Sequence, residues 1–217
     1  MNIPHATIRP AWRSRRAWTM LLLLATIGLA ADLVSKHIAF ERVAGTPVHV
    51  LKSEVEAAVR TGGPAVAALI PPHEETRVIP GVLSFKLVLN TGAVFGAGQG
   101  KRWLFVVFTG VAFVFALWLF ALRTDARDRV AHVAIALVLA GGLGNLYDRL
   151  RYACVRDFIH PLPGWRLPFG LRWPGGSDEL WPYVSNVADK LLLIGIGVLL
   201  VVLWREDTAR EPATPSA

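Results

Sequence analysis

Four apolar runs, each long enough to cross a lipid bilayer, dominate the hydrophobic pattern of this chain. A hydrocarbon core about 30 Å thick requires roughly 20 helical residues. The runs at residues 18–40, 103–122, 130–147 and 187–204 approach or exceed that length, and the second contains no charged residue. The pattern therefore predicts an all-α membrane protein with four transmembrane helices.

The first run has two interpretations, a retained span or a cleaved signal peptide. Its arginine-rich front and leucine-rich centre suit a signal peptide. However, Asp32, Ser35 and Lys36 follow where cleavage would be expected, and no clean small-residue cleavage site precedes them. We therefore favour a retained span.

The links between the spans differ from the spans in composition. Residues 82–95 are rich in β-branched and aromatic side chains, which predicts one or two strands. Because an open sheet edge cannot lie in hydrocarbon, these strands are expected at the outer interface. The sequence thus predicts a single domain over residues 1–210, with an outer insert and β-rich cradle at 41–102, an outer loop at 150–186 and a disordered tail at 211–217. A short helix is expected at residues 53–60.

Basic residues beside the spans predict the orientation of the protein. They occur before the first span, in the link at residues 123–129 and after Trp204. An excess of Lys and Arg marks cytoplasmic loops, so both termini are expected in the cytoplasm. The arginines in the long outer loop do not fit this orientation when Lys and Arg are simply counted on each side of the membrane. The net charge of +7 is spread along membrane edges, which favours anionic lipid over nucleic acid as the partner.

Asp157 and Asp189 flank the polar excursion between the last two apolar runs. Carboxylates at the mouth of a membrane helix are costly to desolvate and are commonly functional. Asp189 falls in the first turn of the fourth span, where the helix dipole stabilises its charged form. Asp157 lies among apolar residues and is expected to hold a proton. Two carboxyls that share one proton can activate a water molecule to attack an amide bond. Asp189 could instead be a simple carboxylate at the helix terminus.

Other polar residues near the spans allow structural and functional interpretations. Asp32 and Lys36 are four residues apart and are expected to form an ion pair. Asn145, Asp148 and Arg149 share one helix face after a glycine run that permits close packing. These three side chains predict either a structural hydrogen-bond network or a cavity lined by polar groups. Asn90 has two interpretations: it begins a turn, or it binds the backbone of an extended peptide substrate.

Several common catalytic motifs are absent from the sequence. It contains neither HExxH for a metalloprotease nor GxSxG for a serine nucleophile. The single cysteine, Cys154, excludes an internal disulfide and a cysteine-based zinc site, and is expected to be half-buried. We expect a site that needs neither a metal nor an organic cofactor.

Five motifs together make the chain resemble bacterial lipoprotein signal peptidases (signal peptidase II). They are ADLVSK at residues 31–36, NTGAVFG at 90–96, GGLGNLYDRL at 141–150, VRDFI at 155–159 and NVAD at 186–189. The resemblance implies an aspartyl endopeptidase of the bacterial inner membrane. Such an enzyme removes the signal peptide from diacylglyceryl-modified prolipoproteins, cutting before the lipidated cysteine on the periplasmic side. It also implies sensitivity to globomycin-type inhibitors, and we expect a monomer.

The resemblance assigns roles by motif. It implies that Asp157 and Asp189 are catalytic, with no fixed division of acid and base. The implied substrate-binding residues are Asn90, Asn145, Arg149 and Asn186, supported by Asp32, Lys36 and Asp148.

The chain departs from the family pattern at several places. Ser185 replaces the usual phenylalanine, Lys190 follows Asp189, and the inserts at 44–80 and 160–183 are long. Two other functions stay open: a catalytically altered relative that binds lipidated peptides, and a small proton-coupled transporter.

Overall fold

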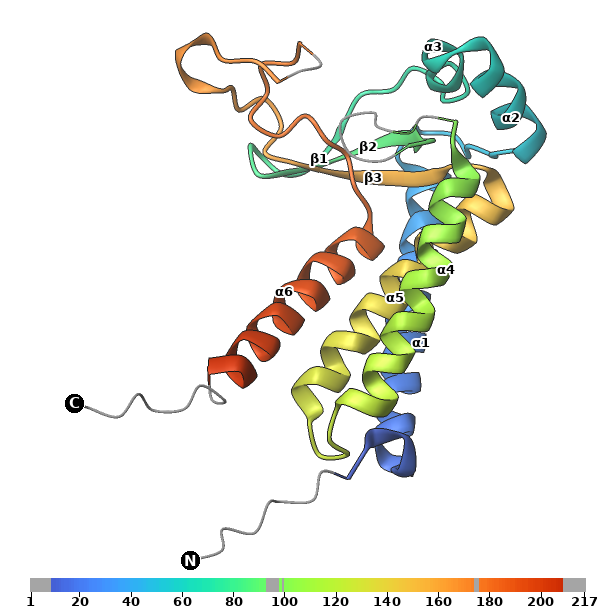
Figure 1. The fold of residues 1–217 in the computed structure, drawn as a ribbon. Coiled ribbons are helices and arrows are strands. Elements are labelled where there is room, and N and C mark those ends of the chain that lie inside the picture. The colour runs from blue at the N-terminus through green and yellow to red at the C-terminus, as the bar shows by residue number, and fades with distance from the viewer. Residues whose placement is uncertain (1–8, 93–97, 99, 174–175, 209–217) are drawn as a thin grey trace, which may run out of the picture.

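The computed structural model describes residues 9–92, 98, 100–173 and 176–208 (Figure 1). The predicted disordered tail at 211–217 lies outside the described residues, as does the end of the predicted strand segment at 93–95. Four long helices form a bundle, with a small sheet across one end (Figure 1). The fold class predicted from the sequence is confirmed.

All four predicted spans are helices long and apolar enough to cross a membrane. They are α1 (Arg15–Arg42), α4 (Arg102–Trp118) with its π-helical continuation Leu119–Arg123, α5 (Arg129–Tyr152) and α6 (Val187–Thr208). The third span is longer than the predicted 130–147. Its polar last turns stay helical because their side chains find partners inside the protein, and it ends where Ala153 adopts a left-handed conformation.

The sheet is antiparallel in the order β1-β2-β3, formed by β1 (Thr76–Ile79), β2 (Leu83–Asn90) and β3 (Val155–Pro161). Only β2 was predicted. Strand β3 was placed within the outer loop 150–186, and that interpretation is wrong. The first four residues of β3 are all buried, so its sequence lacks the alternation of a half-exposed strand.

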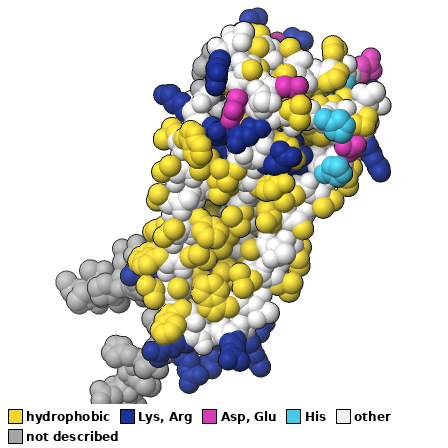
Figure 2. Space-filling model, turned by 90° about the vertical axis from the view of Figure 1, so that its right-hand side faces the viewer, with side chains coloured by type: hydrophobic (Ala, Val, Ile, Leu, Met, Phe, Trp, Pro, Cys, Tyr) yellow, Lys and Arg dark blue, Asp and Glu magenta, His cyan; other side chains and the backbone are white. Residues whose placement is uncertain are grey.

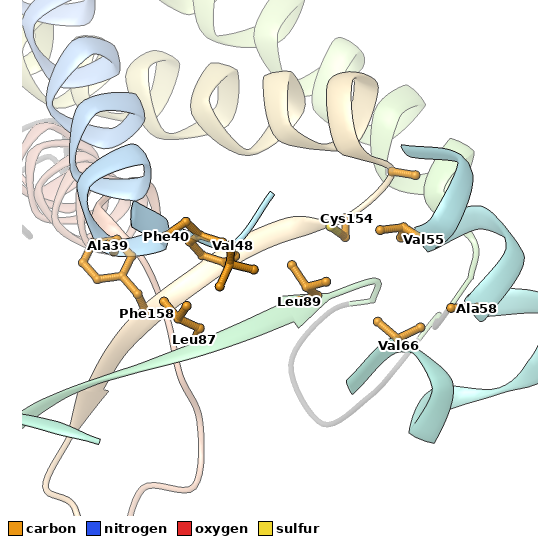
Figure 3. Close-up of a cluster of buried hydrophobic side chains, with 11 residues drawn as sticks. Ala39, Phe40, Val48, Val55, Ala58, Val66, Leu87, Leu89, Cys154 and Phe158 are labelled. Carbon is orange, nitrogen blue, oxygen red and sulfur yellow. The ribbon is translucent and has the colours of Figure 1, made fainter. Parts of the chain in front are cut away.

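The outer insert packs on the sheet through its helices, α2 (Lys52–Thr61) and α3 (Gly63–Ala67). Val55 and Val66 belong to one buried cluster with Leu87, Leu89 and other side chains of the sheet (Figure 3). The predicted helix at residues 53–60 is therefore confirmed. Short 3-10 helices lie at Ala11–Arg13 and Pro168–Gly170.

Cys154 belongs to the same apolar cluster and is free. It is fully buried rather than half-buried as expected. Burial raises the pKa of its thiol to about 12, so the reactive thiolate is disfavoured.

Two glycines let α5 and α6 approach closely. A Cβ at Gly141 would meet the backbone oxygen of Ala188 and lie 2.8 Å from Leu192 Cγ, while one at Gly195 would lie 2.8 Å from the backbone oxygen of Ala134. Small residues at such crossings allow van der Waals packing between membrane helices. The expectation of close packing at the end of the third span is confirmed, and the crossing brings the start of α6 beside the end of α5.

The variant Gly141→Ala tests this packing. We expect it to destabilise the protein by about 1–3 kcal/mol, because backbone atoms of α6 cannot yield to the added methyl group. Gly110→Ala in α4 is the matched control, since a Cβ there meets no atom within 4 Å; it should be neutral or stabilising by up to about 1 kcal/mol. Thermal unfolding in detergent measures both. Equal behaviour of the two variants would contradict the proposed close packing.

Candidate active site

Asp157 on β3 and Asp189 on the first turn of α6 are brought together by one asparagine, Asn186. The side-chain amide of Asn186 donates to Asp157 Oδ1 at 2.6 Å. Its backbone N–H donates to Asp189 Oδ2 at 3.1 Å. One residue thus contacts both carboxyl groups.

The helix terminus itself fixes Asp189. The backbone N–H of Asp189 donates to Asn186 Oδ1 at 3.0 Å, while the Asn186 N–H donates back to the Asp189 carboxylate. This reciprocal pair has the pattern of a capping box, with aspartate in the position where glutamate is common. Capping therefore satisfies two backbone donors and orients the carboxylate at the same time.

Two further asparagines complete the amide contacts. Asn90 at the end of β2 donates to Asp157 Oδ2 at 3.0 Å. Asn145 of α5 donates to Asp189 Oδ1 at 2.8 Å, and its carbonyl oxygen accepts from the Asn186 side chain at 3.1 Å. Each carboxyl oxygen of the pair therefore receives a hydrogen bond from an asparagine.

Asp157 has a strongly perturbed acidity. Only 1% of the residue is exposed. Burial, followed by the negative charge of Asp189, raises the pKa of the Asp157 carboxyl to about 8, against the opposing effect of its Asn90 and Asn186 donors. At neutral pH this carboxyl holds a proton, which supports the expectation drawn from its apolar neighbours.

A buried cation lies behind the amides. The ammonium of Lys36 donates to Asp32 at 2.8 Å and to Asn145 Oδ1 at 3.1 Å, and lies 3.3 Å from Asp148. The predicted ion pair between Asp32 and Lys36 is confirmed. Because an ammonium only donates, it requires the oxygen of the Asn145 amide, which turns the amide nitrogen toward Asp189.

Arg156 is a member of this network that sequence reasoning missed. Its guanidinium pairs with Asp148 at 2.9 Å, and its backbone N–H donates to the same carboxylate at 3.0 Å. The available signal was its place beside Asp157 in the VRDFI motif at residues 155–159. Arg156 thereby anchors β3, and with it Asp157, to α5.

Arg149 extends the site toward the lipid-facing side of the bundle. Its guanidinium donates to the backbone oxygen of Gly92 at 3.2 Å and lies 4.8 Å from the ring centre of Phe105. A cavity of about 210 Å³ between α4, α5 and α6 includes Asn145 and Arg149 in its otherwise largely apolar wall. An apolar ligand group in this cavity would lie next to the amide that holds Asp189.

The structure joins every candidate residue from the sequence into one network. The members are Asp32, Lys36, Asn90, Asn145, Asp148, Arg149, Asp157, Asn186 and Asp189. Ser185, which departs from the family pattern, pairs with Ile159 of β3 through its backbone. Its hydroxyl also donates to the backbone oxygen of Ile159 at 3.3 Å. Among the described residues, no group of three or more His, Cys, Asp or Glu side chains could hold a metal ion.

The variant Lys36→Met tests the buried ion network. It leaves the fully buried Asp32 without its cation, and we expect a loss of about 3–5 kcal/mol in the free energy of unfolding. The double variant Asp32→Asn/Lys36→Met should recover part of that loss. Lys86→Met, which removes an ammonium from an exposed ion pair, should cost about 1 kcal/mol or less. Wild-type stability of Lys36→Met in denaturant unfolding would contradict the role given to the ammonium.

Comparison with known proteins identifies the family of this chain. The chain is 31% identical over 196 residues to the lipoprotein signal peptidase of Syntrophotalea carbinolica, covering 88% of this chain and 95% of that protein. It is 35% identical over 147 residues to the lipoprotein signal peptidase of Symbiobacterium thermophilum, covering 66% of this chain and 87% of that protein.

Solved structures agree on the fold. A bacterial membrane enzyme determined by the in meso method at 2.3 Å resolution aligns with a TM-score of 0.63 and 21% identity, covering 97% of this chain and 99% of that one. A second, at 1.9 Å resolution, aligns with a TM-score of 0.56. The family model for signal peptidase (SPase) II matches residues 24–205. With the motifs, the four spans and these relatives in agreement, the chain belongs to the signal peptidase II family.

Proposed function

We propose that this protein is an aspartyl endopeptidase that removes the signal peptide from diacylglyceryl-modified prolipoproteins. Family membership supports a protease that removes signal peptides from lipoproteins. The observation that supports the aspartyl mechanism is the pair Asp157 and Asp189, linked through Asn186. One carboxyl of the pair holds a proton at neutral pH, because burial raises the pKa of Asp157 to about 8.

The unequal environments of the two carboxyls suggest a division of labour. Asp189, held at the start of a helix by two donors, removes a proton from water, and the resulting hydroxide attacks the scissile carbonyl carbon. Asp157 gives its proton to the carbonyl oxygen. When the tetrahedral intermediate collapses, the amine leaves with the proton held by Asp189, and the intermediate returns a proton to Asp157. The pair titrates as a unit, so kinetic pKa values belong to both groups.

Substrate binding is assigned to the residues that surround this pair. Asn90 and Arg149 lie at the rim and would hold the substrate backbone, while Asn145 and Asn186 orient the carboxyls and line the pocket. The apolar cavity beside Arg149 suits the hydrocarbon part of a lipidated substrate. Cleavage just before the lipidated cysteine follows if the bilayer holds the acyl chains at this depth. A globomycin-type peptide would compete for the same space.

The supporting residues act through the carboxyl pair rather than on the substrate. Lys36 orients Asn145, Asp32 accepts from Lys36 and from the backbone N–H of Ala188 at 2.8 Å, and Asp148 holds Lys36 and Arg156. These contacts tie α1, α5 and β3 to the start of α6. We call Asp32, Lys36 and Asp148 positioning residues for this reason.

The distribution of charge supports the proposed placement in the membrane. Arginines gather at the end of the bundle where α1 begins and α4 ends, which would face the cytoplasm. The carboxyl pair lies at the opposite end and would face the periplasm, with both termini in the cytoplasm and the four spans in the inner membrane. We propose one integral membrane domain over residues 1–210 that works as a monomer. A transporter would need ionisable groups near the bilayer midplane, whereas these cluster at one border.

The substitutions Asp157→Asn and Asp189→Asn test this proposal. Each should lower the rate of prolipoprotein cleavage by a factor on the order of 10² to 10⁴, because the amide cannot transfer the proton. Cleavage of lipidated and unlipidated precursor is followed on a gel, side by side. Asp125→Asn, in the loop at the other end of the bundle, is the matched control and should cleave at the wild-type rate.

Three outcomes would contradict parts of the proposal. Undiminished cleavage by either variant would exclude the aspartyl mechanism. Equal cleavage of unlipidated precursor would exclude the lipid requirement. A wild-type protein that binds the lipidated precursor without cutting it would instead indicate a binding protein.

A further inference from the structure

A large basic cavity lies at the end of the bundle opposite the carboxyl pair. Its volume is about 960 Å³, and it lies between the starts of α1 and α5. Backbone hydrogen bonds hold its walls together: Ala11 N–H donates to Thr124 O at 3.1 Å, and Ala126 N–H donates to Arg9 O at 2.7 Å. The arginines that line it are Arg9, Arg13, Arg16, Arg127 and Arg129.

The arginines of this cavity outnumber the neighbouring carboxylates, which accept hydrogen bonds from backbone N–H groups. Asp125 accepts hydrogen bonds from the backbone N–H groups of Arg127 at 2.8 Å and Arg9 at 2.9 Å, and these bonds lower the pKa of its carboxyl. Asp128 accepts from the backbone N–H of Ala131 at 3.0 Å, as the N-cap of α5. Within the part of the chain that the structure describes, none of the five arginines forms a side-chain ion pair. They are exposed and available to an anion.

An apolar groove adjoins the basic cavity along α1. It has a volume of about 510 Å³ and shares Arg16 and Met20 with the cavity. Beyond these residues it is lined by Arg15, Thr19, Leu23 and Leu24. A ligand filling both spaces must carry an anionic group and, joined to it, a hydrocarbon chain.

We propose that this end of the protein binds an anionic phospholipid, with the phosphate in the arginine-lined cavity and one acyl chain in the groove beside α1. Guanidinium groups match the geometry of phosphate oxygens and donate charge-assisted hydrogen bonds to them. On the face shown in Figure 2, Lys and Arg side chains gather at the lower end, directly below a broad hydrophobic band. That placement sets the cavity at headgroup depth and the groove at acyl-chain depth. A free phosphate would fill the cavity alone, so the groove favours a lipid.

Native mass spectrometry of the purified full chain in zwitterionic detergent tests this proposal. Phosphatidylglycerol should bind saturably and at least roughly tenfold more tightly than phosphatidylcholine, because each Lys or Arg near a membrane surface contributes about 1 kcal/mol toward anionic lipid. Arg16→Gln should weaken phosphatidylglycerol binding about fivefold, and Arg16→Gln/Arg129→Gln about twentyfold or more. Arg16→Lys, which keeps the charge, should bind within about twofold of wild type.

Arg123→Gln is the matched control, because Arg123 lies at the same end of the bundle and lines neither space. It should bind phosphatidylglycerol as the wild type does, and all variants should still cleave prolipoprotein in zwitterionic micelles, which reports correct folding. Equal affinity for both lipids, or equal loss in Arg16→Gln and Arg123→Gln, would overturn the proposal. Glycerol phosphate binding as tightly as phosphatidylglycerol would identify a site for free anions and overturn it as well.

Discussion

The active site depends on the burial of one ammonium group, that of Lys36, away from water. A charge in such a place must be matched by neighbouring groups, and Lys36 meets Asp32, Asp148 and Asn145 from two helices. With one proton on Asp157, the network contains as many anions as cations. The anions are Asp32, Asp148 and Asp189, and the cations are Lys36, Arg149 and Arg156. A second negative charge on the pair is disfavoured by the burial of Asp157 and by the negative charge of Asp189, so one proton stays.

Two kinds of structure divide the work of placing the carboxyls. The helix crossing at Gly141 brings α6 against α5, so that Asp189 meets Asn145. The antiparallel pairing of β3 with β2 sets Asn90 within reach of Asp157. Asn186 then joins the two halves, because its side-chain oxygen caps α6 while its side-chain nitrogen reaches Asp157 on β3. Contacts between secondary-structure elements therefore hold Asp157 and Asp189 together, although the two residues are far apart in the sequence.

The sequence predicted those features whose signals are local. Hydrophobic runs located the four spans, glycines indicated the close helix crossing, and the four-residue spacing of Asp32 and Lys36 predicted their ion pair. Strand β3 was missed because burial on both faces removes the alternation that reveals a strand. The link from Lys36 through Asn145 toward Asp189 could not be read from spacing, since it depends on which helices become neighbours. Motif resemblance supplied the candidate residues, and the structure supplied their connections.

The most direct test of the central claim, that Asp157 holds a proton shared with Asp189, is infrared spectroscopy of the carboxyl groups as a function of pH. Because the pKa of Asp157 is raised to about 8, its protonated carbonyl band should be present at neutral pH and disappear as the pH rises through that value. The band should be missing from Asp157→Asn under the same conditions. A neutral-pH spectrum that is the same for the wild type and Asp157→Asn would contradict the account.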